Sequence, residues 1–237
     1  MGIVYGASNL FFKSALRAFG KCEVVGKENV PREGALIVVS NHISNIDPVI
    51  LNVSIPRRVK FMAKAELFEK PLISNLFKAY GAFPINENGR EFQAINHSLA
   101  ILNRKDAMGI FPEGAMNPGS LGKAMLGTAM IAMMSDAPIL PVGITGTESV
   151  ERWRQICYPK GTFKIAIGKP FSLHIPKNVK MRKNMETVTD TIMHRIAELL
   201  PEDYRGVYHH SWEGERDYTS PPDWWRQYYA DYYVNSD

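Results

Sequence analysis

The stretch ALIVVSNHISNIDPVIL, residues 35–51, is the segment around which the chain is organised. Its first part, Ala35 to Val39, is an apolar run typical of a buried strand, and the apolar run after Pro48 is typical of a helix. Asp47 followed by Pro48 predicts a helix N-cap with proline at the first helical position. We therefore expect a strand, a loop that carries His42, and a helix.

His42 and Asp47 are five residues apart at this strand-to-helix connection. A chain that leaves a strand, turns and re-enters as a helix can bring residue i+5 back beside residue i. The Asp47 carboxylate would then keep one imidazole nitrogen protonated and leave the other free to accept a proton. The spacing also fits a loop histidine and a simple helix cap, so it does not by itself choose between the two interpretations.

Residues 41–47, NHISNID, resemble the N-H-x-S-x-x-D block of the glycerolipid acyltransferases, which contains their H-x4-D motif. Residues 111–114, FPEG, resemble the F-P-E-G block of the same family. Three other segments are similar to family blocks in the same order: FMAKAEL at 61–67, GAFPI at 81–85 and PVGI at 141–144. The resemblance runs from about Val24 to Tyr208 and is strongest to the bacterial 1-acylglycerol-3-phosphate acyltransferases.

The resemblance implies roles for residues in two of these blocks. His42 would take the proton of the acceptor hydroxyl, and Asp47 would fix its tautomer and stabilise the imidazolium. This chemistry requires no Ser or Cys nucleophile, so we expect direct transfer without an acyl-enzyme. Glu113 would help to hold the acceptor together with its neighbours Pro112 and Gly114; an ion pair of Glu113 with a nearby cation is the alternative.

The chain departs from the family pattern where relatives carry cations for the acceptor phosphate. Glu87 stands where an Arg is usual, Ala115 and Met116 replace the Thr-Arg after F-P-E-G, and Met125 replaces a helix Lys. Three other cations could still hold the phosphate: Lys64, Arg90 and Lys123.

The function that follows is transfer of a fatty acyl group from acyl-CoA or acyl carrier protein to a lysophospholipid hydroxyl. Lysophosphatidic acid is the expected acceptor, giving phosphatidic acid. A lipid acceptor with less phosphate character and a lipid-binding relative without catalysis remain open alternatives. The expected partners are the donor as co-substrate, the membrane lipid acceptor and the membrane surface. We expect no other cofactor, no metal and no nucleic acid.

Composition agrees with one α/β domain. The chain has 237 residues, 45% of them hydrophobic and 22% charged, and its two cysteines offer no disulfide framework. Residues 1–200 contain 25 Lys and Arg against 16 Asp and Glu, whereas residues 201–237 contain 3 against 8. A basic body favours anionic headgroups. No apolar run reaches the roughly 18 residues that span a bilayer, so we expect a cytoplasmic protein, peripheral on the inner face of the cell membrane.

Alternating strands and helices with short connections predict an α/β fold. We expect a largely parallel mixed sheet with helices on both faces, as in the glycerophosphate acyltransferase-like fold, including a helix over Leu121–Ser135. The predicted division is an amphipathic segment (1–20), an acyltransferase domain (21–208) and an aromatic-rich tail (209–237). The first segment could rest in the membrane interface or pack on the domain. The tail could dock on the domain, a partner or the membrane.

Overall fold

Seven strands form one sheet in the order β1-β7-β6-β2-β5-β3-β4. The computed structural model describes residues 2–69, 74, 77–78, 80–85, 91–174, 181–209 and 219–220. Arg90 and nearly all of the aromatic-rich tail lie outside these residues. The strands are β1 (Gly20–Val25), β2 (Leu36–Ser40), β3 (Val59–Lys64), β4 (Ala82–Ile85), β5 (Ala107–Ile110), β6 (Ile139–Thr145) and β7 (Gly161–Ile167).

The sheet is mixed but largely parallel. Strands β2 to β6 all run in one direction, β7 is antiparallel to β6, and β1 is parallel to β7. A second, two-stranded sheet pairs β8 (Ser172–Leu173) with β9 (Thr219–Ser220). The carboxyl ends of β2, β5 and β6 therefore meet at one edge of the main sheet, which we call the carboxyl edge.

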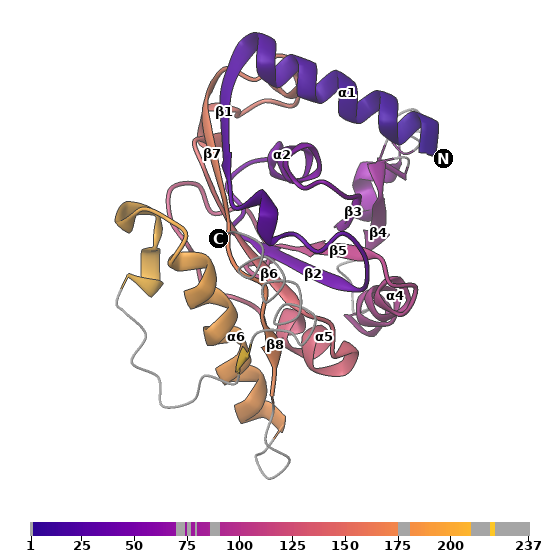
Figure 1. The fold of residues 1–237 in the computed structure, drawn as a ribbon, viewed down its shortest axis with the longest axis vertical. Helices are drawn as coiled ribbons and strands as arrows, with labels where there is room; N and C mark the ends of the chain where they lie inside the picture. Colours follow the sequence, from indigo (N-terminus) through magenta and orange to yellow (C-terminus); the bar gives the residue numbers. More distant parts are fainter. Residues whose placement is uncertain are drawn as a thin grey trace, which may run out of the picture.

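Helices cover both faces of the sheet (Figure 1), which confirms the predicted fold class. One face carries α1 (Gly2–Phe19) and α2 (Asp47–Ser54), and the other carries α4 (Glu91–Asn103), α5 (Gly127–Ser135) and α6 (Met181–Ala197). All five residues of β2 are buried. Leu36 and Val38 face the first layer, and Ile37 and Val39 face the second. Burial on both sides explains why this strand reads as a continuous apolar run.

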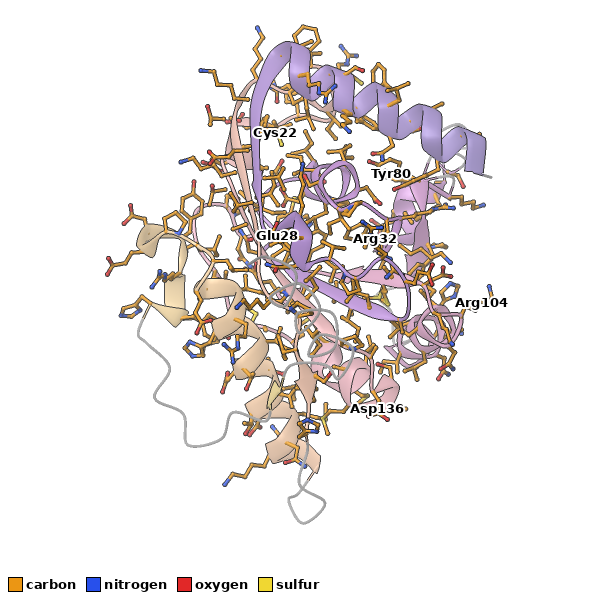
Figure 2. All side chains as sticks on the ribbon, viewed as in Figure 1. Cys22, Glu28, Arg32, Tyr80, Arg104 and Asp136 are labelled. Carbon is orange, nitrogen blue, oxygen red and sulfur yellow. The ribbon has the colours of Figure 1, made fainter. Side chains whose placement is uncertain are left out.

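Helix α1 packs on the domain through one side only. Phe12 and Leu16 are buried there, and the Phe12 ring lies 5.7 Å from the ring of Tyr80, labelled beneath α1 in Figure 2. The hydroxyl of Tyr5 donates to Asn52 Oδ1 of α2 at 3.2 Å. Exposed apolar side chains remain on the rest of the helix: Val4, Leu10, Phe11 and Phe19. In the described ranges, no helix has the length and apolar character needed to cross a membrane.

Helix α5 is shorter than the sequence predicts, because it begins at Gly127 rather than at Leu121. The N–H groups before it donate to distant acceptors instead of to a helical ladder. Leu121 N–H bonds Tyr204 O at 2.9 Å, and Met125 N–H bonds Pro112 O at 2.8 Å. Tertiary hydrogen bonds therefore hold residues 121–126 as a loop at the carboxyl edge.

Candidate active site

The candidate site lies where two loops leave the carboxyl edge of the sheet. Strand β2 delivers Asn41 and His42, and the neighbouring parallel strand β5 delivers Phe111, Pro112 and Glu113. Parallel strands that end side by side bring the residues after them together. Residues 71 apart in the chain become direct partners in this way, because His42 N–H donates to Glu113 Oε1 at 3.0 Å.

The imidazole of His42 is held by the carboxylate of Asp47. His42 Nδ1 lies 2.8 Å from Asp47 Oδ2, with the Asp47 side chain fully buried and the His42 side chain 18% exposed. Because an ionised carboxylate only accepts hydrogen bonds, Nδ1 carries the proton and Nε2 is left as the acceptor nitrogen. The structure thus brings together the two side chains that the spacing pairs.

Asp47 does not cap its own helix as the sequence predicts. Helix α2 begins at Asp47 itself, with Ile46 at the N-cap position and no side-chain cap. The carboxylate turns back to the preceding loop, where Oδ2 also accepts the N–H groups of Ile43 at 2.7 Å and Ser44 at 2.8 Å. One oxygen atom therefore organises both the loop backbone and the imidazole. These loop N–H groups are consequently already bonded to protein.

Phe111 supports the other side of the imidazole. Its ring is stacked on His42 with centroids 4.1 Å apart and an angle of 16° between planes. Phe61 of β3 continues the stack, 5.7 Å from Phe111. A Cβ on Gly109 of β5 would lie 2.1 Å from the Phe61 ring, so only glycine leaves room for that ring there. The hydrogen bond to Asp47 alone would let the imidazole ring tilt about Nδ1, and stacking on Phe111 fixes the plane of the ring.

Two buried polar side chains fix the ends of the His42 loop. The Asn41 side-chain amide accepts from Ile144 N–H and donates to Ile144 O, both at 2.8 Å. It thus pairs with the backbone of β6 as a neighbouring strand would. The Ser44 hydroxyl donates to Val150 O at 2.6 Å. Ser44 therefore shapes the loop.

Glu113 joins the His42 loop to the loop that follows β5. Its Oε1 accepts His42 N–H, and its Oε2 accepts Asn117 Nδ2 at 2.6 Å and Gly122 N–H at 2.7 Å. Asn117 N–H in turn donates to His42 O at 2.8 Å. Burial raises the pKa of Glu113, while these hydrogen bonds oppose the rise. Among the described residues, the hydrogen-bond partners of Glu113 are amide groups.

Pro112 and Gly114 shape the turn around Glu113. Pro112 is buried, and its carbonyl accepts Met125 N–H at 2.8 Å. Gly114 has a φ of 70°, and a Cβ there would lie 2.4 Å from Met125 Sδ. These two residues therefore contribute backbone geometry and close packing to the site.

Of the three candidate cations, Lys123 alone has a described side chain, so their meeting in one pocket stays a prediction. Lys64 ends β3, but its side-chain placement is outside what is described, and Arg90 lies in the segment 86–90, which is not described at all. Lys123 is exposed on the loop that contains Gly122. Met116 and Met125, at positions where a cation is usual, are exposed on the same loop.

Sequence reasoning missed several residues that support the pair. Asn117 and Gly122 complete the bonding of Glu113, yet neither belongs to a block with a recognisable spacing. The stacking role of Phe111 was also missed, although its place in F-P-E-G, one strand away from His42, was a usable signal.

The sequence also matches a known family. The profile of the Acyltransferase family matches residues 21–145, which is more than half of the chain and includes both loops of the site. The chain belongs to the Acyltransferase family.

Individual relatives of this acyltransferase extend the match. The 1-acyl-sn-glycerol-3-phosphate acyltransferase of Bacillus subtilis (strain 168) is 28% identical over 188 residues, 79% of this chain and 92% of that protein. A protein of the same name from Borreliella burgdorferi is 26% identical over 132 residues, 54% of this chain and 53% of its own.

A solved structure shares the fold of this acyltransferase. The crystal structure of the 1-acyl-sn-glycerophosphate (LPA) acyltransferase PlsC from Thermotoga maritima superposes with a TM-score of 0.66. The match covers 82% of this chain and 79% of that one, at 24% sequence identity. At this identity the likeness shows a shared fold.

Proposed function

We propose that this protein transfers a fatty acyl group from a thioester donor to the hydroxyl of lysophosphatidic acid, giving phosphatidic acid. The observation that carries the proposal is the His42–Asp47 pair at 2.8 Å, on a loop fixed by Glu113. Relatives that bear the name of this activity support the choice of acceptor. The donor is a thioester of coenzyme A or of acyl carrier protein.

In the proposed reaction, His42 Nε2 accepts the proton of the acceptor hydroxyl as its oxygen attacks the thioester carbon. Buried Asp47 stabilises the imidazolium that forms. The tetrahedral intermediate then collapses: the carbon–sulfur bond breaks, and the imidazolium returns its proton to the leaving thiolate. The products are an ester and a thiol, and the enzyme ends in its starting protonation state.

Membrane contact belongs to the same proposal, because the acceptor is a bilayer lipid. Helix α1 exposes Leu10 at 67% and Phe11 at 51%, while Lys13 and Arg17 are exposed beside them. Apolar side chains flanked by cations suit the interface of an anionic leaflet. We propose that α1 rests on the inner face of the cell membrane, with the opposite side docked on the domain.

A second candidate keeps the chemistry and changes the acceptor. Met116 and Met125 are exposed on the loop that Glu113 organises, where the acceptor phosphate would otherwise meet cations. An apolar surface there favours a lipid acceptor with less phosphate character.

The experiment that tests the proposal is an acceptor panel. Purified full-length protein is incubated with labelled acyl-CoA or acyl carrier protein and with lysophosphatidic acid, a lysophospholipid diester or an uncharged lipid alcohol. The proposal predicts preferred acylation of lysophosphatidic acid, and transfer that is roughly 10²–10⁴-fold slower in His42→Ala. Acylation of only the uncharged alcohol would establish the second candidate, and no acylation by the folded protein would leave a lipid-binding relative.

A further inference from the structure

The segment Pro201–Tyr208, which we call the strap, follows α6 and comprises two short 3-10 turns, Glu202–Tyr204 and Gly206–Tyr208 (Figure 1). It lies beyond the residues matched by the family profile, which end at 145. Nothing in the motif blocks accounts for it. The strap nevertheless contacts loops that lie at the carboxyl edge of the sheet.

The strap holds the loop that completes the Glu113 site. Both backbone groups of Leu121 bond to it: Leu121 N–H donates to Tyr204 O at 2.9 Å, and Val207 N–H donates to Leu121 O at 3.4 Å. The Leu121 side chain is buried in the core beneath. The next residue is Gly122, whose N–H donates to Glu113 Oε2. The strap is therefore one residue from the bonding network of the catalytic loop.

A second contact of the strap reaches the loop on the other side of the site. The Tyr204 hydroxyl donates to Glu148 Oε1 at 2.7 Å, in the turn Thr147–Ser149 after β6. Val150 N–H donates to Thr147 O in that turn, and Val150 O accepts the Ser44 hydroxyl. The strap therefore bonds both the loop after β5 and the loop after β6. These two loops in turn form hydrogen bonds with the His42 loop.

The strap is itself anchored. The Tyr208 ring packs edge-on against His194 of α6 with centroids 5.2 Å apart, and a hydrogen bond joins its hydroxyl to the backbone of Ala124. Arg205 Nε donates to Leu200 O at 3.0 Å. Gly206 has a φ of 51°, and a Cβ there would lie 2.1 Å from Leu121 O. Only glycine permits this approach of the strap to the loop.

We propose that the strap is a positioning element of the active site: it holds Leu121 and Glu148, and through Gly122 and Glu113 it sets the backbone of His42. The proposal rests on the proposed function only in taking His42 as the base. The strap touches no reacting atom in this scheme. It keeps the imidazole in the geometry in which transfer is fast.

The test is Gly206→Ala in the full-length protein, with Gly26→Ala as the matched control. Gly26 has a φ of 78°, and a Cβ there would lie 2.0 Å from Ile167 O, so the control suffers the same kind of strain and clash at the β1–β7 end. Amide hydrogen exchange at His42 and Gly122, read by NMR, reports the Glu113 bonds without any substrate. Turnover with acyl-CoA and lysophosphatidic acid is measured in parallel.

The strap proposal predicts at least about tenfold faster exchange at both amides in Gly206→Ala than in Gly26→Ala. It also predicts a turnover loss on the order of 10²-fold, the effect of about 1 Å of misplacement, with an unchanged Michaelis constant for acyl-CoA. Equal exchange at these amides in the two variants would overturn it. If the wild type fails to acylate the acceptor, the proposed function fails while the exchange measurement still decides the strap.

Tyr204→Phe provides a second test in case Gly206→Ala does not fold. It removes the hydroxyl bonds to Glu148 and to the backbone of Gly146, both in the stretch that follows β6, and Tyr158→Phe, an exposed tyrosine elsewhere, is its control. We expect Tyr204→Phe to speed exchange at Val150 and to lower turnover several-fold relative to that control. Unchanged exchange together with unchanged turnover would contradict a role for the strap in positioning the site.

Discussion

At the scale of single residues, the site depends on two carboxylates that each accept three hydrogen bonds from protein donors. Asp47 Oδ2 accepts three hydrogen bonds, from His42 Nδ1 and from the N–H groups of Ile43 and Ser44. Glu113 accepts three more with its two oxygens. We expect the charge to matter most at Asp47 and the hydrogen bonds to matter most at Glu113. Substituting each carboxylate by its amide distinguishes these two contributions.

Asp47→Asn should keep the loop but lose the charge. Because one oxygen takes all three bonds, an amide can place its own oxygen there and keep them. Its NH2 then lies at the Oδ1 position, where no partner is found among the described residues, and this unsatisfied donor costs about 1–3 kcal/mol of stability. The Nδ1 tautomer would survive, and stabilisation of the imidazolium would not. We predict a loss in kcat of roughly 10²–10⁴-fold, measured in a folded variant by steady-state transfer. Near-normal kcat would mean that the charge is not needed.

Glu113→Gln should disturb the loop itself. An amide oxygen at the Oε2 position leaves an NH2 facing His42 N–H, and the opposite orientation leaves it facing Asn117 and Gly122. An unsatisfied buried donor costs about 1–3 kcal/mol, so we expect that loss in the free energy of unfolding together with slower transfer. Urea denaturation measures the first. Glu186→Gln, an exposed partner of Arg182 on α6, is the control and should change neither quantity.

At the scale of elements, what could be predicted depended on whether the pattern was local. The apolar runs of β2 and α2 are local, and both elements lie where the sequence predicts them. The predicted start of α5 was wrong because Leu121 forms a hydrogen bond with a residue 83 positions away in the chain. The prediction that Asp47 caps its helix was wrong for a similar reason. Its carboxylate accepts N–H groups of the preceding loop instead of those of α2. The spacing of His42 and Asp47 predicts their pairing. The contacts of the strap join residues far apart in the chain, so no local pattern predicts them.

Helix α1 allows a prediction about membrane contact. Its buried side includes Phe12 and Leu16, so deleting the helix would also expose the core. The double substitution Leu10→Ser and Phe11→Ser changes only exposed side chains. Each is worth about 1.5 kcal/mol when buried, so we expect roughly hundredfold weaker sedimentation with anionic vesicles, and normal activity on a detergent-dispersed acceptor. Binding equal to that of a Tyr158→Ser control would place the contact elsewhere.

At the scale of the whole molecule, a phosphate-bearing acceptor needs cations near the catalytic loop. The usual positions of the cations hold Met116 and Met125, and Lys123 is the described candidate on the same loop. A charge-assisted hydrogen bond is worth about 1.5–3 kcal/mol. Lys123→Ala should therefore raise the Michaelis constant for lysophosphatidic acid ten- to a hundredfold and leave that for acyl-CoA unchanged. Lys183→Ala, on the surface of α6, is the control; equal constants in both variants would exclude Lys123 from the acceptor site.

The central claim is that His42 is the base of an acyl transfer to lysophosphatidic acid. The most direct measurement is the rate at which purified, folded wild type and His42→Ala move a labelled acyl group from acyl-CoA to that acceptor. We predict phosphatidic acid as the labelled product of the wild type, and a rate at least roughly 10²–10⁴-fold lower in His42→Ala with donor binding retained. A folded His42→Ala protein that transfers at the wild-type rate would contradict the claim.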